Sequence, residues 1–537
     1  MVKTVGIIGA GVSGLTAIKS CLEEGLEPTC FERGDDIGGL WNFREDPEDG
    51  RPSIYKSLVS NVSKETISFS DFPIPEDFPN FLPHVKYLEY CKLYAEHFQL
   101  LKYIKFKTVV CSVEKHLDFK QTGQWVVITE SDDKKHTTIF DAVMICSGQH
   151  VDPLLPMDAF PGINKFKGKI LHSRQYKRPI GFDGKKVLII GMGNSGVDLS
   201  TELCTRASQV YLSTKRGVWV LRRLGSKGYP YDVLLLTRYK SWIQSILPLA
   251  VSQWLFKKQM NNQFNHHLYD FEPEGAMTKE PLVNEELPSR ILSGSIIMKP
   301  GVIKFMETSV QFSDGTTVDN IDIVIFATGY NLSFPFLDES VIKMDNSKGF
   351  LYKKIIPVDI EKPTLAFIGF IQPVGSIMVA AELQNRWATR LFKGLLELPS
   401  KDEMKNYLVS DEKFRIKWFG SAKENSRRMN YVTYLDELAS QIKVKPNILK
   451  LLLTDPVLAL KVFFGPLNSY QYRLTGPGKW AGARDAIMTQ WDRIEKPLRT
   501  RGKREKSCSP VLTLLPLSIL PWIFFLVISL LAFWIKS

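Results

Sequence analysis

The chain has 537 residues, of which 44% are hydrophobic and 23% are charged, a composition that excludes a disordered or collagen-like protein and allows three or four globular domains. Its 69 Lys and Arg residues against 57 Asp and Glu residues give a net charge of +12, but no long basic arm is present, so nucleic acid is not an expected partner. Seven widely spaced cysteines without a Cys-x-x-Cys pair predict neither a disulfide framework nor a metal site.

A first dinucleotide-binding pattern begins close to the amino terminus. The apolar run Val5–Ile8 is followed by a turn of the form Gly-x-Gly-x-x-Gly and by a stretch of helical periodicity that ends at Gly25. The glycines of such a unit let a pyrophosphate approach bare backbone at the helix amino terminus. A second strand, Thr29–Phe31, delivers an acid that can bind a ribose 2′-hydroxyl, which favours FAD or NAD over NADP. The predicted contacts are Gly9, Ala10, Gly11, Val12, Ser13, Gly14 and Glu32.

The same pattern recurs after the apolar run Lys186–Ile190, but cations replace the acid. Beyond the strand Gln209–Leu212 the acid position holds a threonine, and basic residues follow. Cationic side chains neutralise a ribose 2′-phosphate that a carboxylate would repel. We therefore predict an NADP site, although a solvated basic turn is an alternative and the cation that contacts the phosphate stays open. The predicted contacts are Gly191, Gly193, Gly196, Val197, Thr214, Lys215, Arg216 and Arg223.

Two dinucleotide sites with opposite charge preferences indicate an oxidoreductase in which a nicotinamide reduces a flavin. The expected fold is α/β, with two Rossmann-like dinucleotide-binding domains. Strands within 140–148 and 321–329 both end in a hydroxyl residue and glycine, which predicts crossings between the domains. The expected division is an FAD-binding domain at 1–150 and 331–445, an NADP-binding domain at 151–330 with an inserted helical subdomain at about 225–300, and a membrane-proximal region at 446–510.

The carboxyl terminus is typical of a membrane anchor. Residues 511–535 form a run of 25 residues without a charge, and five basic residues lie between Arg499 and Lys506. This length predicts a transmembrane helix, and the basic flank predicts that the preceding body faces the cytosol. Pro516 and Pro521 interrupt helical hydrogen bonding, so a kinked or amphipathic anchor is the alternative.

Three further motifs resemble those of the flavin-containing monooxygenases of vertebrate microsomes, which are class B flavoprotein monooxygenases. Residues 166–176 match the family's identifying pattern and end in Tyr176, where Baeyer–Villiger relatives typically carry Trp. Residues 326–336 resemble a second signature, and 38–41 resemble a flavin-contacting loop. The resemblance implies FAD contacts by Leu40, Trp41 and Val62, NADP contacts by Ser60, Ser195 and Asp198, and catalytic roles for Asn61, which also touches the cofactor, and Asn194.

The resemblance implies a reaction that the fingerprints alone do not specify. NADPH would reduce FAD, and the reduced flavin would take up O₂ to form a C4a-hydroperoxyflavin that oxygenates nitrogen or sulfur in small lipophilic xenobiotics. A Baeyer–Villiger oxygenase and an NADPH oxidase that releases hydrogen peroxide are the alternatives. The implied partners are O₂, such substrates and membrane lipid, and the implied location is the endoplasmic reticulum membrane with the body in the cytosol. An oligomer is left open.

Overall fold

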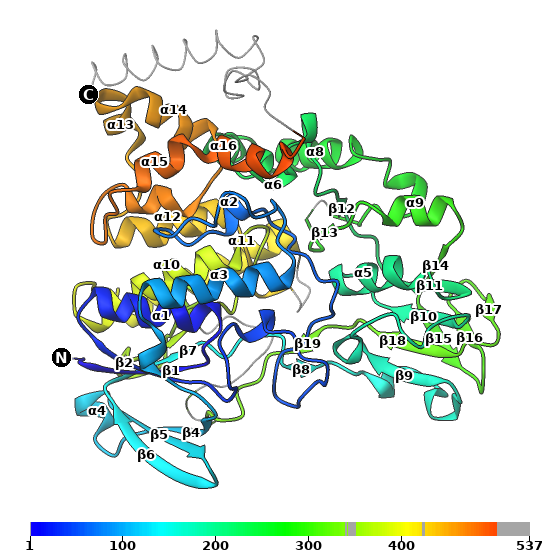
Figure 1. Cartoon of the computed structure of the whole chain (residues 1–537), viewed down its shortest axis with the longest axis horizontal. Coiled ribbons are helices and arrows are strands. Elements are labelled where there is room, and N and C mark those ends of the chain that lie inside the picture. The colour runs from blue at the N-terminus through cyan, green and yellow to red at the C-terminus, as the bar shows by residue number, and fades with distance from the viewer. Residues whose placement is uncertain (1, 276, 339–340, 342–350, 421–424, 502–537) are drawn as a thin grey trace.

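The computed structural model describes residues 2–501 apart from 276, 339–340, 342–350 and 421–424. Two five-stranded sheets lie side by side, each with helices on one face and a small antiparallel meander on the other (Figure 1). The predicted anchor at 511–535 lies outside the described residues. Within those residues, no helix is both long enough and apolar enough to cross a bilayer.

The first sheet is entirely parallel and has the order β22–β7–β1–β2–β3. Its central strands are buried apolar runs, as expected when helices and a meander cover both faces of a parallel sheet. The strand of this sheet that comes last in the chain, β22, pairs with β7 although more than 200 residues separate them. The strands are β1 (Thr4–Ile8), β2 (Glu27–Phe31), β3 (Ile104–Lys105), β7 (Ala142–Ile145) and β22 (Leu365–Phe367).

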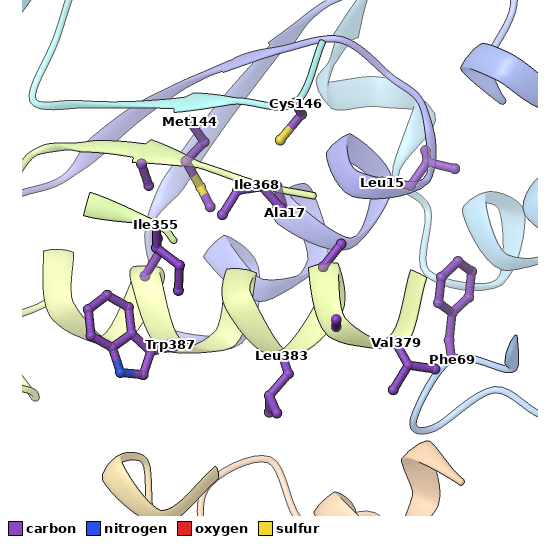
Figure 2. Close-up of a cluster of buried hydrophobic side chains, with 14 of the residues drawn as sticks. Leu15, Ala17, Phe69, Met144, Cys146, Ile355, Ile368, Val379, Leu383 and Trp387 are labelled. Carbon is purple, nitrogen blue, oxygen red and sulfur yellow. The ribbon is translucent and has the colours of Figure 1, made fainter. Parts of the chain in front are cut away.

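Helices α1 (Val12–Glu23) and α10 (Ile377–Phe392) pack against each other on one face of this sheet. Figure 2 shows part of this core, where Ala17 of α1 lies near Met144 of β7 on one side of α10, and Leu383 of α10 points the other way. Helix α3 (His84–His97) covers the same face (Figure 1). The opposite face is covered by the meander of β4 (Val109–Lys115), β5 (Trp125–Ser131) and β6 (Lys134–Phe140).

The second sheet is also entirely parallel and has the order β14–β11–β10–β18–β9. Helices α5 (Asn194–Leu203) and α9 (Leu287–Leu292) cover one face, and the meander of β15 (Val302–Phe305), β16 (Val310–Phe312) and β17 (Thr317–Val318) covers the other. The strands of the sheet are β9 (Lys169–His172), β10 (Lys186–Ile190), β11 (Gln209–Ser213), β14 (Ile296–Lys299) and β18 (Ile323–Phe326).

The long connection between β11 and β14 is partly helical. It contains α6 (Tyr231–Leu235), α7 (Arg238–Ile246) and α8 (Leu249–Asn261), as well as the short parallel strands β12 (Val220–Leu221) and β13 (Leu282–Val283). Thr237 caps α7 by accepting a hydrogen bond from the backbone N–H of Lys240. The predicted segment 225–300 includes β14, which belongs to the second sheet because it pairs with β11.

The carboxyl-terminal part adds a layer of helices above the first sheet (Figure 1). A buried ion pair between Arg493 and Glu65 joins this layer to the short helix α2 (Lys64–Ile67). Trp491 and Ile494 pack with Val233 of α6. The helices are α11 (Lys401–Phe419), α12 (Tyr431–Gln441), α13 (Ile448–Thr454), α14 (Pro456–Phe464), α15 (Ala483–Met488) and α16 (Gln490–Glu495).

Candidate functional site

The first glycine turn joins β1 to α1. Gly9 has φ +100°, which favours glycine, and a Cβ there would lie 2.8 Å from the carbonyl oxygen of Cys146. A Cβ on Gly14 would lie 1.8 Å from the carbonyl oxygen of Gly9, so the helix can approach the strand only with glycine at this position. Helix α1 has no side-chain cap and no acid in its first turn. Its free N–H groups therefore fit a pyrophosphate.

A second loop closes over this turn. The backbone N–H of Gly38 donates to Ala10 O at 3.1 Å. A Cβ on Gly11 would lie 3.6 Å from the Cα of Gly39, so the segment that carries Leu40 lies against the turn. Trp41 is buried, and its ring lies 4.4 Å from the ring of Tyr87. The predicted flavin-contacting loop and the glycine turn are thus brought together.

Glu32 follows β2 and also reaches the turn. Its carboxylate accepts hydrogen bonds from the backbone N–H groups of Ala10, at 2.9 Å, and Gly34, at 2.7 Å. A carboxylate has about four lone-pair sites, so Glu32 keeps acceptor capacity for a ribose hydroxyl. Val12 and Ser13 form the first turn of α1, as the pattern predicts.

The second glycine turn joins β10 to α5 and repeats this geometry. Gly191 has φ +112°, and a Cβ on Gly196 would lie 2.0 Å from the carbonyl oxygen of Gly191. Helix α5, which contains Ser195 and the fully buried Val197, likewise has no side-chain cap and no acid in its first turn. Gly193 differs from Gly11 because a Cβ there would meet no atom within 4 Å. This turn also fits a pyrophosphate, and it is open.

The predicted cations lie directly beyond β11, at the position that Glu32 occupies beyond β2. Thr214 Oγ1 donates to the carbonyl oxygen of Arg216 at 2.8 Å and shapes a tight turn. Lys215 Nζ lies 5.9 Å from the centre of the Phe160 ring. The two cations at the end of this strand fit a ribose 2′-phosphate.

Arg223 follows β12 instead and lies against the predicted catalytic loop. Its guanidinium donates to Asn61 Oδ1 at 2.8 Å and to the carbonyl oxygen of Ser60 at 3.3 Å, and it pairs with Glu285 at 3.3 Å. Asn61 Nδ2 has no acceptor within the described part of the chain. The amide oxygen of Asn61 is therefore occupied, and its N–H₂ group is available to a ligand.

The backbone around Asn61 is held from two sides. Ser60 exchanges backbone and side-chain hydrogen bonds with Leu82, each at 2.8 Å, and its hydroxyl donates to the carbonyl oxygen of Val62 at 3.0 Å. Asp232 of α6 accepts from both the N–H and the hydroxyl of Ser63 at 2.8 Å. Burial raises the pKa of Asp232, and the hydrogen bonds that it accepts oppose that rise.

Asn194, the second predicted catalytic residue, has a matching arrangement. Its Oδ1 accepts a hydrogen bond from the backbone N–H of Val283 in β13 at 2.8 Å, and its Nδ2 has no acceptor among the described residues. Because β12 pairs with β13, one small sheet tethers both asparagines, Asn61 through Arg223 and Asn194 through Val283. The glycine patterns could not reveal β12 and β13, since strands of two residues leave no periodicity, and they could not reveal Asp232 or Glu285, which reach the site only through the tertiary fold.

Asp198 lies on α5 at the edge of a cavity of about 700 Å³. It accepts from Tyr55 Oη at 2.6 Å and from Asn284 Nδ2 at 3.0 Å. Burial raises the pKa of Asp198, and the hydrogen bonds from Tyr55 and Asn284 oppose that rise. The cavity lies between the segment that follows strand β2 of the first sheet and helix α5 of the second sheet. Its lining includes Asp198, Thr201, Glu202 and Thr205 of α5, Tyr55, Ser57 and Phe81, and Arg223, Glu285 and Arg290.

The side chain of His172 forms hydrogen bonds to nearby backbone groups. Its Nδ1 accepts from the N–H of Arg174 at 3.2 Å, and its Nε2 lies 3.0 Å from the carbonyl oxygen of Gly329, which assigns the proton to Nε2. Burial lowers its pKa. Within the described residues, no group of three or more His, Cys, Asp or Glu side chains could hold a metal ion.

Comparison with known proteins agrees with this geometry. Residues 2–534 match the family described as flavin-binding monooxygenase-like. The chain is 54% identical to dimethylaniline monooxygenase 2, N-oxide-forming, of Cavia porcellus, over 93% of this chain and 94% of that protein. It is 53% identical to flavin-containing monooxygenase 3 of Homo sapiens, over 95% of this chain and 96% of that protein.

Two solved structures have a similar fold. The S-allyl-L-cysteine S-oxygenase of Allium sativum superposes with a TM-score of 0.63 at 24% identity, over 93% of this chain and 99% of that one. The NADP⁺-bound cyclohexanone monooxygenase of a Rhodococcus species gives 0.58 at 14% identity, over 82% and 97%. The family match and the close relatives together show that the chain belongs to the flavin-containing monooxygenases, which are oxidoreductases that depend on FAD and NADP.

Proposed function

We propose that the protein takes electrons from NADPH through FAD and uses O₂ to oxygenate a nucleophilic nitrogen or sulfur atom of small lipophilic molecules. The observation that carries this proposal is the shared arrangement of Asn61 and Asn194, whose amide oxygens are both occupied while both N–H₂ groups are available. The activities after which two similar proteins are named, N-oxide formation and S-oxygenation, support the substrate class.

The two cofactors would be bound by two different domains of the chain. Residues 1–150 with 331–445 form the FAD-binding domain, in which the α1 amino terminus holds the pyrophosphate and Glu32 binds the ribose. Residues 151–330 form the NADP-binding domain, in which the α5 amino terminus and Thr214–Arg216 hold the phosphates. When bound, FAD supplies hydride acceptance and the activation of O₂.

Asn61 and Asn194 would donate hydrogen bonds to oxygen next to the flavin. A side-chain amide donates without being an acid, so it can stabilise a reactive oxygen atom without protonating it for release as hydrogen peroxide. Such fixed neutral donors are effective in a site that excludes water. Oxygenation, rather than simple oxidation of NADPH, is therefore the reaction that these two side chains favour.

Product analysis tests the proposal. The purified holoenzyme is incubated with NADPH and ¹⁸O₂ in the presence of a thioether, a tertiary amine, a ketone or no substrate. We expect one ¹⁸O atom in a sulfoxide and an N-oxide, with little ester and little hydrogen peroxide. An ester as the main product would instead indicate a Baeyer–Villiger oxygenase, and hydrogen peroxide equal to NADPH in every reaction would indicate an oxidase.

We further propose that the protein lies on the cytosolic face of the endoplasmic reticulum membrane. Helices α7 and α14 lie side by side, with Tyr239 5.1 Å from Phe464 between ring centres. Together with α8 and α13, which lie with α14 near the top of Figure 1, they expose large apolar side chains, among them Trp254, exposed by 58%, and Leu453, exposed by 85%. We call this the apolar helix face; it consists of Trp242, Ile246, Val251, Trp254, Leu255, Leu449, Leu453, Val457 and Leu460.

Two features support a lipid occupant for this face. Lys257, Lys258 and Lys450 lie on the same helices, and cations beside apolar side chains favour anionic lipid headgroups. The described chain ends at Arg501, shortly before the uncharged run 511–535. A spanning segment at that point would hold the nearby helices close to the bilayer surface.

Flotation with anionic vesicles tests this location. Removing residues 502–537 should release part of the protein, and adding Trp254→Glu with Leu453→Glu should release the remainder while FAD stays bound. Leu117→Glu is the matched control, because Leu117 is 99% exposed beyond β4 and outside the apolar helix face. Equal flotation of the truncated and intact chains would show that the tail is not the anchor. Equal flotation of the truncated chain with and without Trp254→Glu and Leu453→Glu would show that the apolar helix face does not bind the membrane.

A further inference from the structure

Arg223 makes a set of contacts that a phosphate ligand does not explain. Three of its nitrogens are used within the protein, by the carbonyl oxygen of Ser60, by Asn61 Oδ1 and by Glu285. Its side chain is only 15% exposed, and the guanidinium lies 5.9 Å from the centre of the Phe81 ring. Glu285 balances its charge locally, whereas a 2′-phosphate site needs a cation with charge to spare.

A guanidinium only donates hydrogen bonds, so the contact at 2.8 Å fixes which end of the Asn61 amide faces Arg223. The oxygen must face the guanidinium, and the N–H₂ group must face the other way. Asn61 without this contact could turn about its terminal torsion, for which two orientations are nearly equivalent. One of them would direct the amide oxygen, an acceptor, at the ligand oxygen.

We propose that Arg223 is a positioning residue that holds the Asn61 amide with its N–H₂ group toward the oxygen-bearing site, and that it does not bind the 2′-phosphate of NADP. This inference rests on the proposed function of Asn61. Arg223 also donates to the carbonyl oxygen of Ser60, but Leu82 and Asp232 hold the backbone of Ser60 and Ser63 without it, so its distinct effect is on the amide. Glu285 in turn holds Arg223 next to β12.

The two roles for Arg223 predict different kinetics. If it positions Asn61, Arg223→Ala should raise the share of NADPH electrons that appear as hydrogen peroxide by at least fivefold and should change the KM for NADPH by less than threefold. The same loss of coupling should appear when a high concentration of NADH is the reductant. A phosphate-binding role predicts the opposite pattern, with a large rise in KM for NADPH, no change with NADH and unchanged coupling.

A double-mutant cycle shows whether Arg223 acts through Asn61. In the Asn61→Ala background, Arg223→Ala should change coupling by less than twofold, because no amide is left to orient. Arg223→Lys keeps the charge with a single donor group and should give intermediate coupling. Arg290→Ala is the matched control, since Arg290 lines the same cavity but pairs with Glu286, and it should leave coupling unchanged.

Two measurements on the oxidised holoenzyme do not depend on turnover. The ratio of Kd for NADP⁺ to Kd for NAD⁺, from calorimetric titration, should change by less than threefold in Arg223→Ala. Hydrogen–deuterium exchange of backbone amides in residues 58–66 should stay as slow as in the parent. A rise in that ratio of tenfold or more would overturn the proposal in favour of phosphate binding.

Two other results would overturn the proposal in favour of a general structural role for Arg223. They are additive effects of Asn61→Ala and Arg223→Ala on coupling, and fast hydrogen–deuterium exchange throughout residues 58–66 in Arg223→Ala. If Arg223→Ala does not retain FAD, the same comparisons are made with Arg223→Lys. Failure of the proposed function is a separate outcome, because it would appear as absence of oxygenated product in the unmodified protein.

Discussion

The two dinucleotide-binding units share a turn but differ in what surrounds it. In the first unit, residues 38–41 lie on Gly11, and α10 lies along α1, with Asn385 Nδ2 donating to Ser13 O and Thr16 Oγ1 at 2.8 Å. In the second unit, Gly193 faces open space, and α5 lines a cavity of about 700 Å³. A closed turn suits a cofactor that stays bound, and an open turn suits one that must enter and leave in each catalytic cycle.

The largest expected effect comes from adding one methyl group at equivalent glycines. Gly14→Ala places a Cβ 1.8 Å from Gly9 O, and Gly196→Ala places one 2.0 Å from Gly191 O, so each should push its helix away from its strand. We expect Gly14→Ala to be purified with less than a tenth of the FAD of the parent. Gly196→Ala should keep its FAD and raise the KM for NADPH at least tenfold. FAD absorbance and steady-state kinetics measure the two effects.

Gly193→Ala is the control for this pair, because its Cβ meets no atom within 4 Å and the protein should keep its FAD and its fold. Two results would contradict the assignment of FAD to the first unit and NADP to the second. One is that Gly14→Ala loses NADPH binding while it retains FAD, and the other is that Gly14→Ala and Gly196→Ala lose FAD equally.

A second difference between the units is a buried charge cluster that joins α1 to the carboxyl-terminal part. Arg473, with a side chain 1% exposed, pairs with Glu23 of α1, with Asp71 and with Glu382 of α10. Burial opposes the ionisation of Glu23, but the charges of Arg473 and Lys19 outweigh burial and lower its pKa to about 2. Glu23 therefore stabilises the fold at any pH above its ordinary value of 4.5, and this contribution is lost as the pH falls from there toward 2.

We expect Glu23→Gln to lower the free energy of unfolding at pH 7 by about 3–4 kcal/mol, because a pKa that falls from 4.5 to about 2 is worth about 1.4 kcal/mol for each pH unit between these values. The difference between parent and variant should shrink as the pH falls below 4.5. Urea unfolding followed by tryptophan fluorescence at pH 7, 5, 4 and 3 measures it. Glu307→Gln, at an exposed ion pair with Lys167, should leave the midpoint unchanged. A difference that persists undiminished at pH 3 would show that Glu23 acts by packing alone.

The smallest effect should separate the cofactors by charge. Arg216→Ala removes a cation from the end of β11, where charge-assisted hydrogen bonds to phosphate are worth about 1.5–3 kcal/mol and solvent screening reduces this value. We expect the KM for NADPH to rise roughly tenfold and the KM for NADH to stay unchanged. Arg206→Ala, which removes an exposed cation paired with Asp183, is the control. Equal shifts for the two reductants would mean that Arg216 does not read the 2′-phosphate.

Local pattern and spacing were enough to predict the repeated parts of the fold. The strand expected at Thr29–Phe31 is β2, Glu27–Phe31, and the strand expected at Gln209–Leu212 is β11, Gln209–Ser213. Both glycine turns have the geometry that their spacing requires, because a strand–turn–helix unit is determined by residues close together in sequence.

The setting of the predicted catalytic residues could not be predicted in this way. Arg223 was grouped with Lys215 and Arg216 because it lies close to them in sequence, but the tertiary fold brings it to Asn61, 162 residues away. The tether of Asn194 to Val283 spans 89 residues. Contacts of this kind depend on how the connection between β11 and β14 folds back over the first unit, and no periodicity in the sequence encodes that path.

The position of β22 at the edge of the first sheet has a consequence for biosynthesis. All strands of the second sheet come from one continuous stretch, between Lys169 and Phe326, whereas the first sheet and its helical cover need β22 and α10, which ends at Phe392. Because a chain leaves the ribosome from its amino end, the second unit can fold before the first unit is complete. Until Phe392 has emerged, the edge of β7 and the apolar side of α1 stay uncovered, so the early nascent chain is the form of this protein that most needs a chaperone.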